Sequence, residues 1–454
     1  MILQKLQRLG MAASYDSCGG TKEKSYREWG IPYEYQNFIY NCTQTTENVF
    51  VNGATNRDGK YKASKEKALY EKHETTEEEK KDLWGKMKQA LPESENARLN
   101  KPNKCLLMKV LQDNTCMHDC KYCVNSGCKN HKEKLAPKEI ADSFLHLHKQ
   151  GYLTGLFLSS AVHIDAEKST EEMIASARML RERGYRGYIH MKVLPDAPEH
   201  LIEEMAFYAN RLSVNIEAST TQGFNELTST KDYKEGLLRR VRTLDKLKHD
   251  SDKQSKERGE GRGGWFCDSG NITNGEDLRF KSFTTQIILG ANEENDKDII
   301  SRMDSLYSET SLYRTYFSAF SPVEGTPLAE KNAENKKREH RLYEADWLFR
   351  IYGFAKKTIE KGLNDHKNFS LTHDVKQSIA LSMPELFPLD PNTATREELL
   401  LVPGLGPKSV DKIILEREEN KFREMQDLIS IGARINKAKS FINLEGKQTN
   451  LFGF

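Results

Sequence analysis

Between residues 104 and 320 the sequence alternates between short apolar runs and longer amphipathic stretches. The apolar runs have the length and composition of buried strands, and the stretches between them have helical spacing of apolar residues. Parallel strands need a crossover connection, usually a helix, so this alternation predicts a parallel α/β sheet or barrel of six strands. The predicted strands cover 105–112, 155–160, 187–195, 211–218, 283–290 and 313–320, and the predicted helices between them cover 137–151, 169–184, 198–210, 231–250 and 297–309.

The regions around this alternation differ from it in composition. Residues 1–102 are polar, although the first of them are amphipathic and predict a helix. Residues 331–384 have a helical pattern, and residues 385–454 are typical of a separate small helical domain. Within the α/β region 103–330, residues 250–280 are rich in Gly, Ser and charge and predict a flexible loop. We therefore expect an N-terminal extension, an α/β domain, a helical connector and a C-terminal all-α domain.

Composition excludes several classes of protein. The 454-residue chain is 30% charged and 37% hydrophobic, and no apolar run approaches the roughly 20 residues that a membrane helix needs. Lys5 and Arg8 interrupt the first apolar residues, which argues against a secretory signal, so we expect a cytoplasmic protein. The net charge of +2 offers no overall field that would attract nucleic acid, so any such binding must depend on a local motif.

Four of the eight cysteines fall within thirteen residues, in the segment NTCMHDCKYCVNSGC. In a long charged chain such clustering predicts metal ligation and not a disulfide framework. The segment follows the first predicted strand, where α/β barrels carry catalytic groups. Three thiolates on a four-iron cluster leave one iron open for chemistry, whereas a fourth thiolate gives a closed ferredoxin-like cluster or a structural zinc site. The three candidate ligands are Cys116, Cys120 and Cys123, and Cys128 is the fourth ligand in the alternative.

The motif CMHDCKYC, with the aromatic Tyr122 before its third cysteine, resembles the signature of the radical S-adenosylmethionine (SAM) superfamily. The resemblance extends over roughly residues 103–330 and implies a partial (β/α)6 TIM-like barrel. It implies that a [4Fe–4S] cluster on the three cysteines binds SAM through its open iron. With an electron from a donor such as a ferredoxin or flavodoxin, SAM is then cleaved to a 5′-deoxyadenosyl radical. His118 and Asp119 lie inside the motif, and we expect them to form loop hydrogen bonds and not to act in acid–base catalysis.

Polar residues at the ends of two predicted strands are candidates for SAM contacts, together with Tyr122. Members of the family often carry Gly-Gly-Glu after the second strand, whereas here that strand ends in Ser159 and Ser160. Their hydroxyls and backbone carbonyls could bind SAM, and an ordinary strand end is the alternative. Asn215 and Glu217 alternate with apolar neighbours on the fourth strand and so share one face, as in family strands that place a polar residue near the SAM ribose. A carboxylate inside a barrel mouth is costly unless it is paired, which favours a function for Glu217.

The segment 390–418 carries the signals of two short helices joined by a tight turn. Thr395 and Glu398 form a capping box that opens the first helix. The sequence Gly404-Leu405-Gly406 predicts a hairpin, because glycines tolerate positive φ, and the proline after it is favoured in the first turn of the next helix. A second, more divergent hairpin is expected around residue 432.

This segment resembles a helix–hairpin–helix DNA-binding module. Such a module holds backbone phosphates on the amides of its hairpin and second helix, without reading sequence. The implied contacts are Gly404, Leu405 and Gly406, with Lys408 and Lys412 adding charge. The alternative is a hairpin that serves packing or protein contact, because residues 389–454 contain ten Lys/Arg and ten Asp/Glu, and strong nonspecific DNA binders are usually basic.

The two modules together resemble radical SAM proteins associated with DNA modification or repair. The sequence therefore predicts an enzyme that cleaves SAM and acts on a nucleic acid, with DNA as the first choice. Two alternatives stay open. One is a radical SAM enzyme that acts on RNA or a small molecule, and the other is a non-enzymatic nucleic-acid-binding protein with a closed four-cysteine metal site.

Overall fold

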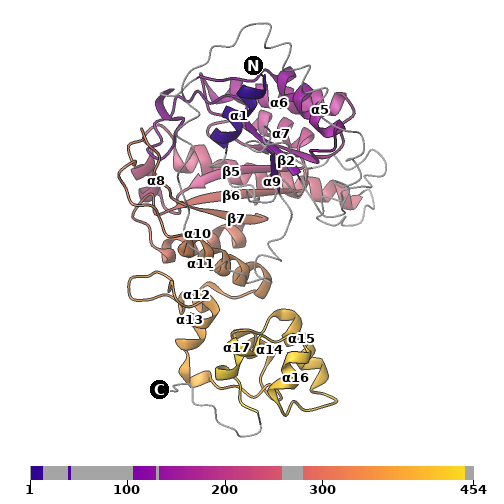
Figure 1. The fold of residues 1–454 in the computed structure, drawn as a ribbon, viewed down its shortest axis with the longest axis vertical. Coiled ribbons are helices and arrows are strands. Elements are labelled where there is room, and N and C mark those ends of the chain that lie inside the picture. Colours follow the sequence, from indigo (N-terminus) through magenta and orange to yellow (C-terminus); the bar gives the residue numbers. More distant parts are fainter. Residues whose placement is uncertain (1, 14–38, 42–105, 129–131, 258–279, 445–454) are drawn as a thin grey trace. The chain divides into compact units, whose positions relative to one another are not determined.

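The structure is a computed structural model that describes residues 2–13, 39–41, 106–128, 132–257 and 280–444 (Figure 1). Most of the predicted extension 1–102 lies outside these ranges. Within them, seven strands form one sheet in the order β1 to β7. The chain forms two compact units. The first contains residues 1–117, 128–212 and 251–281, and the second contains residues 118–127, 213–250 and 282–454.

The first unit contains the N-terminal part of the sheet. Strand β2 (Leu106–Leu111) pairs in parallel with β3 (Gly155–Ser159), which pairs in parallel with β4 (Tyr188–Lys192). β1 (Ile39–Asn41) was not expected from the sequence and pairs antiparallel with β2. The helix predicted at the N-terminus is present as α1 (Ile2–Ala12).

Helices follow each parallel strand of this unit, as the alternation predicted. They are α5 (Pro137–Lys149), α6 (Ala166–Glu182) and α7 (Glu199–Tyr208). The predicted start of α6 at residue 169 was wrong. Asp165 accepts a hydrogen bond from the backbone N–H of Lys168 at 2.6 Å and caps the helix three residues earlier.

The second unit contains β6 (Ser282–Leu289), β7 (Arg314–Ala319) and, from residue 213 on, β5 (Arg211–Glu217). β6 and β7 pair in parallel, and the Thr285 hydroxyl on β6 donates to the Val214 carbonyl on β5 at 2.7 Å. β6 is followed by α10 (Asp296–Glu309), and β7 by α11 (Lys336–Trp347). The α/β class predicted from the sequence is therefore confirmed.

The connection after β5 differs from the single predicted helix 231–250. It contains α8 (Thr221–Leu227), a π-helical turn η7 (Tyr233–Leu238) and α9 (Arg239–Glu257). α9 continues through residues 250–257, which were expected to belong to a loop. The rest of that predicted loop, 258–279, lies outside the described residues.

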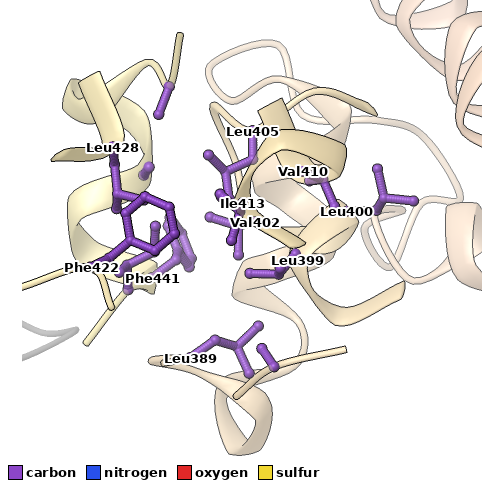
Figure 2. Close-up of a cluster of buried hydrophobic side chains, with 14 of the residues drawn as sticks. Leu389, Leu399, Leu400, Val402, Leu405, Val410, Ile413, Phe422, Leu428 and Phe441 are labelled. Carbon is purple, nitrogen blue, oxygen red and sulfur yellow. The ribbon is translucent and has the colours of Figure 1, made fainter. Parts of the chain in front are cut away.

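The C-terminal part of the second unit is helical, as predicted. Its buried apolar side chains come from both predicted hairpins, and Figure 2 shows Leu428 and Phe441 of the second pointing toward Val402 and Ile413 of the first. None of the helices in the described ranges has both the length and the apolar character needed to cross a bilayer. The elements are η8 (Leu348–Tyr352), α12 (Lys356–Glu360), α13 (Val375–Leu381), η9 (Pro384–Leu386), α14 (Arg396–Leu401), α15 (Pro407–Glu416), α16 (Met425–Ser430), α17 (Ile435–Ala438) and η10 (Lys439–Phe441).

Candidate functional site

The cysteine loop, residues 116–128, directly follows β2. Cys116, Cys120 and Cys123 are not joined in disulfides, and the first two are buried and the third half-buried. The Cys123 N–H donates to the Cys120 carbonyl at 3.1 Å, so the second and third cysteines belong to one tight turn. The side chain of Cys128 lies outside the described residues.

Asp119 fixes this loop to the segment that follows α8. Its carboxylate accepts hydrogen bonds from the backbone N–H groups of Ser229, at 3.0 Å, and Thr230, at 3.2 Å. It also accepts bonds from the hydroxyls of Thr228, Ser229 and Thr230. Burial opposes ionisation, but the hydrogen bonds from Ser229, Thr228 and Thr230 outweigh it and hold the pKa of Asp119 well below its usual range. The expected role of Asp119 in loop hydrogen bonding is confirmed.

His118 contacts Thr230, one of the residues that bind Asp119. Its ring is buried, and Nδ1 is 3.2 Å from the Thr230 hydroxyl oxygen. Burial, and after it the charge of Lys231, lowers the pKa of His118 to about 4, against a smaller opposite effect of Asp119. The imidazole is therefore neutral near pH 7 and serves as a buried part of the loop, as the sequence predicted.

Tyr122 connects the loop to the end of β5. Burial raises its pKa well above the usual value, and the charges of Glu217, Cys120 and Cys123 and a hydrogen bond to Glu217 raise it further. The Tyr122 hydroxyl thus stays protonated and is bonded to the Glu217 carboxylate. Glu217 is buried and Asn215, two residues earlier on β5, is half-buried, and a face shared by the two stays a prediction.

Glu217 has a backbone conformation that a non-glycine residue rarely adopts, with φ 62°. The turn after it is held from β6. The Ser219 and Thr220 N–H groups donate to the Glu294 carboxylate at 2.6–3.0 Å, and the Thr220 hydroxyl does so at 2.7 Å. A strained residue persists only where its surroundings over-determine it, and Glu294 supplies part of that constraint.

Two further side chains hold the same turn through its carbonyls. The Tyr233 hydroxyl donates to the Ala218 carbonyl at 2.8 Å, and Arg302 Nε donates to the Ser219 carbonyl at 2.7 Å. The Arg302 guanidinium also lies 5.5 Å from the centre of the Tyr233 ring. Both polar groups of Ser219's backbone are therefore bonded, and Glu217 leaves the strand in one fixed direction.

Gly223 shows how tightly Glu294 is enclosed. A Cβ at this position would come within 2.3 Å of Glu294 Oε1 and 2.5 Å of Asn292 Nδ2. Neither Glu294 nor Gly223 was recognised from the sequence, since the hydrogen bond from Ser219 to Glu294 joins segments 75 residues apart. In the sequence, only the polar run after β6 indicated that Glu294 could have such a role.

We expect Glu294→Ala to lower the free energy of unfolding by about 1–3 kcal/mol, because the two buried N–H groups of Ser219 and Thr220 lose their acceptor. Glu293→Ala is the matched control, since the Glu293 side chain is 83% exposed, and it should change stability by less than about 0.5 kcal/mol. Urea unfolding followed by circular dichroism measures both. Equal midpoints for the two variants would contradict this role of Glu294.

The end of β3 lies beside the beginning of the cysteine loop. Ser159 is buried, and its carbonyl accepts the Gln112 N–H at 2.8 Å. Ser160 is half-buried, and its hydroxyl donates to the Ala161 carbonyl at 2.9 Å. One residue further, the Val162 carbonyl accepts the Met117 N–H at 2.8 Å. This segment thus helps to hold the residue next to Cys116.

The donor chemistry of the loop fits an iron–sulfur cluster, because it offers three cysteines outside disulfides in a short, partly buried segment. In the part of the chain that the structure describes, no three His, Cys, Asp or Glu side chains are already gathered closely enough to hold a metal ion. The cluster assignment therefore stays a prediction that rests on the spacing and chemistry of the cysteines.

The first C-terminal hairpin has the expected turn, with one difference. Thr395 and Glu398 form the predicted capping box, and Gly404 has φ 87°. Gly406 was also expected to need positive φ, but it has φ −105° and caps α15 in an extended conformation. The Leu405 side chain is buried, so only its backbone could contact a ligand. Lys408 and Lys412 are exposed.

The two hairpins pack closely against each other. The Arg434 N–H of the second donates to the Gly404 carbonyl at 3.0 Å, and the Ser409 hydroxyl donates to the Gly432 carbonyl at 3.2 Å. Gly432 has φ 92° and lies between α16 and α17, where the second hairpin was expected. Lys376 on α13 donates to the Leu405 carbonyl.

No family model and no curated protein sequence matches this chain. Some solved structures are similar at low identity. The FeFe-hydrogenase maturase HydG from Carboxydothermus hydrogenoformans aligns over 71% of this chain and 74% of its own, with TM-score 0.38 and 12% identity. In another HydG crystal structure the match spans about half of that chain, 48%. Methylornithine synthase PylB aligns over 56% of this chain and 68% of its own, with TM-score 0.36 and 13% identity. The cobalamin-dependent S-adenosylmethionine radical enzyme OxsB aligns over 68% of this chain and 45% of its own, with TM-score 0.31 and 12% identity.

Proposed function

We propose that this chain is a radical SAM enzyme that modifies or repairs DNA. The observation that carries the proposal is the junction between the cysteine loop and β5. There the Cys-x3-Cys-x2-Cys segment is fixed by Asp119, and its Tyr122 is bonded to the buried carboxylate of Glu217. Radical SAM chemistry needs a thiolate-held cluster beside polar groups that orient SAM, and this junction supplies both kinds of residue.

The cluster would be held by Cys116, Cys120 and Cys123. Such a cluster, when bound, would supply the one electron for reductive cleavage of SAM to methionine and a 5′-deoxyadenosyl radical. The residues of the chain would bind SAM and orient it. Glu217 and Asn215 share a strand face on which they could accept hydrogen bonds from ribose hydroxyls.

The backbone after β3, at Ser159 and Ser160, would receive the methionine amine. Here the chain departs from the glycine-rich segment that is usual in the family. The Ser160 hydroxyl already bonds to the Ala161 carbonyl. Backbone carbonyls of this segment are therefore better candidates for the contact than the two hydroxyls.

Tyr122 keeps its proton and donates a hydrogen bond to Glu217. This bond orients the carboxylate toward the loop. The turn held by Glu294, Tyr233 and Arg302 fixes the backbone from which Glu217 projects. A pre-organised carboxylate of this kind binds SAM without first reordering.

The C-terminal hairpin would hold the DNA backbone as a helix–hairpin–helix module. α15 begins without a side-chain cap, and Lys408 and Lys412 on it are exposed. Space at the turn supports this, since a Cβ on Gly406 would meet nothing nearer than the Tyr352 hydroxyl at 3.5 Å. Backbone amides and two lysines form a suitable site for a phosphate. We further propose a low-potential donor such as a ferredoxin or flavodoxin as the electron source, and a cytoplasmic location.

Anaerobic reconstitution with iron and sulfide, followed by reduction with dithionite in the presence of SAM, tests the chemistry. We expect 5′-deoxyadenosine and methionine, detected by liquid chromatography and mass spectrometry. A well-formed cluster, verified by electron paramagnetic resonance (EPR), that releases neither product would overturn the enzyme assignment. Heat-treated protein carried through the same reconstitution is the control for free iron and sulfide.

A further inference from the structure

Helix α9 carries a row of basic residues along its exposed side. The members are spaced three and four residues apart, so they lie on one face of the helix, and all are exposed. We call them the α9 basic row. They are Arg239, Arg242, Lys246, His249 and Lys253.

The rest of α9 is used for packing inside the unit. Val241 and Leu244 are buried on the opposite side. Asp245 accepts the Ser311 N–H at 2.7 Å and the Ser311 hydroxyl at 2.6 Å, and it also lies 3.6 Å from His249 of the row. Asp250 and Asp252 are exposed beside the row, and Glu235 in the preceding turn lies 3.7 Å from Arg239. Counted over the whole of α9, seven Lys and Arg residues stand against four Asp and Glu residues, so the helix keeps an excess of positive charge.

The row begins close in the chain to the anchor of the cysteine loop. Asp119 of the loop accepts hydrogen bonds from the Ser229 and Thr230 N–H groups, and Lys231 follows them directly in the chain. The π-helical turn η7 then leads directly into α9. A polyanion that follows α9 would thus be led toward the loop that we assign to the chemistry.

We propose that the α9 basic row binds the phosphate backbone of duplex DNA. This inference rests on the proposed nucleic-acid substrate and adds a second binding surface to it. Row positions that are three or four residues apart are about 5–6 Å apart at Cβ, and the whole row is about 21 Å long. DNA places one phosphate per about 3.4 Å along each strand, so the row can face several consecutive phosphates.

The distribution of charge also favours DNA binding by the α9 basic row over DNA binding by the C-terminal hairpin alone. Residues 389–454 contain ten basic and ten acidic residues, so the C-terminal module brings no net charge to a polyanion. The row supplies four permanent cations and a histidine on one helix face. Affinity for duplex DNA comes mainly from neutralised phosphates, and the row provides that neutralisation.

The test is binding of a fluorescein-labelled duplex of roughly 30 base pairs, measured by anisotropy between about 50 and 200 mM NaCl. The variant is Arg242→Gln with Lys246→Gln. The control is Lys337→Gln with Lys357→Gln, which removes the same charge from exposed positions on α11 and α12. Each lost phosphate contact reduces the magnitude of the slope of log K against log salt by about 0.9. The row variant loses two contacts, so the magnitude of its slope should be nearly two units smaller than that of wild type. Its affinity at low salt should be about tenfold weaker.

Each outcome decides between possibilities. Equal slopes for the row variant and the control would overturn the row while leaving the hairpin and the enzyme assignment intact. A wild-type protein that does not bind the duplex would overturn the DNA substrate itself, and the row with it. If the row variant binds the duplex like wild type but loses turnover with reduced flavodoxin as donor, the row is a surface for an acidic protein and this inference is wrong.

Discussion

We expect Cys120→Ala to abolish both iron incorporation and SAM cleavage. Cys120 is buried in the turn that also contains Cys123. With two thiolates left, a four-iron cluster would have two open irons and would not be retained. Iron and sulfide analysis, the EPR spectrum of the reduced protein and 5′-deoxyadenosine release should all fall to background.

Cys128→Ala is the matched control for this experiment. If the cluster has three protein ligands, Cys128→Ala should keep iron, the EPR signal and SAM cleavage close to wild type. If Cys128→Ala destroys the metal site as completely as Cys120→Ala does, the open-iron assignment fails and the closed four-cysteine site stands. Thermal unfolding of both variants without metal shows whether either substitution disturbs the fold itself.

The elements of the α/β region could be predicted because each strand is mostly buried and rich in apolar residues, and the helices between them show an apolar face. β1 could not be predicted in this way. It is three residues long and owes its structure to pairing with β2. The continuation of α9 to residue 257 was hidden by the polar, Gly-rich composition of the segment after it. Composition alone marks such segments as loops, although a helix end can extend into them.

Some features of the candidate site could likewise be predicted from the sequence and others could not. The face predicted for Asn215 and Glu217 comes from the period of a strand, and the cysteines follow from their spacing. The acceptor of the Ser219 and Thr220 N–H groups does not, because Glu294 comes from another strand end and reaches them only in the folded chain. The positive φ of Glu217 is equally invisible in sequence, since the residue type gives no sign of it.

The hairpin glycines illustrate a finer limit. Both were expected to serve the turn, and only Gly404 has positive φ. At Gly404 a Cβ would lie 2.6 Å from the Arg434 carbonyl oxygen and 3.1 Å from Lys437 Cβ, in the second hairpin. Gly404 is thus required by backbone conformation and by contact between the hairpins, whereas Gly406 has open space around it.

We therefore expect Gly404→Ala to destabilise the C-terminal helices by about 2–4 kcal/mol, the sum of about 1–2 for the left-handed backbone and about 1–3 for overpacking, with partial relaxation. Gly406→Ala should leave their stability within about 0.5 kcal/mol of wild type. Hydrogen–deuterium exchange of peptides from residues 396–444 in the full chain measures this local stability. Unchanged exchange in Gly404→Ala would contradict the packing between the hairpins.

Gly406→Ala then separates the two interpretations of the hairpin, because its fold is expected to be intact. The added methyl group would stand where a backbone phosphate approaches the start of α15, so duplex affinity should fall about tenfold, or 1.4 kcal/mol. Retained affinity with retained exchange protection would mean that the turn serves packing alone. In that case the α9 basic row would remain as the proposed DNA-binding surface, and the salt dependence of its own variant would decide whether DNA is the substrate.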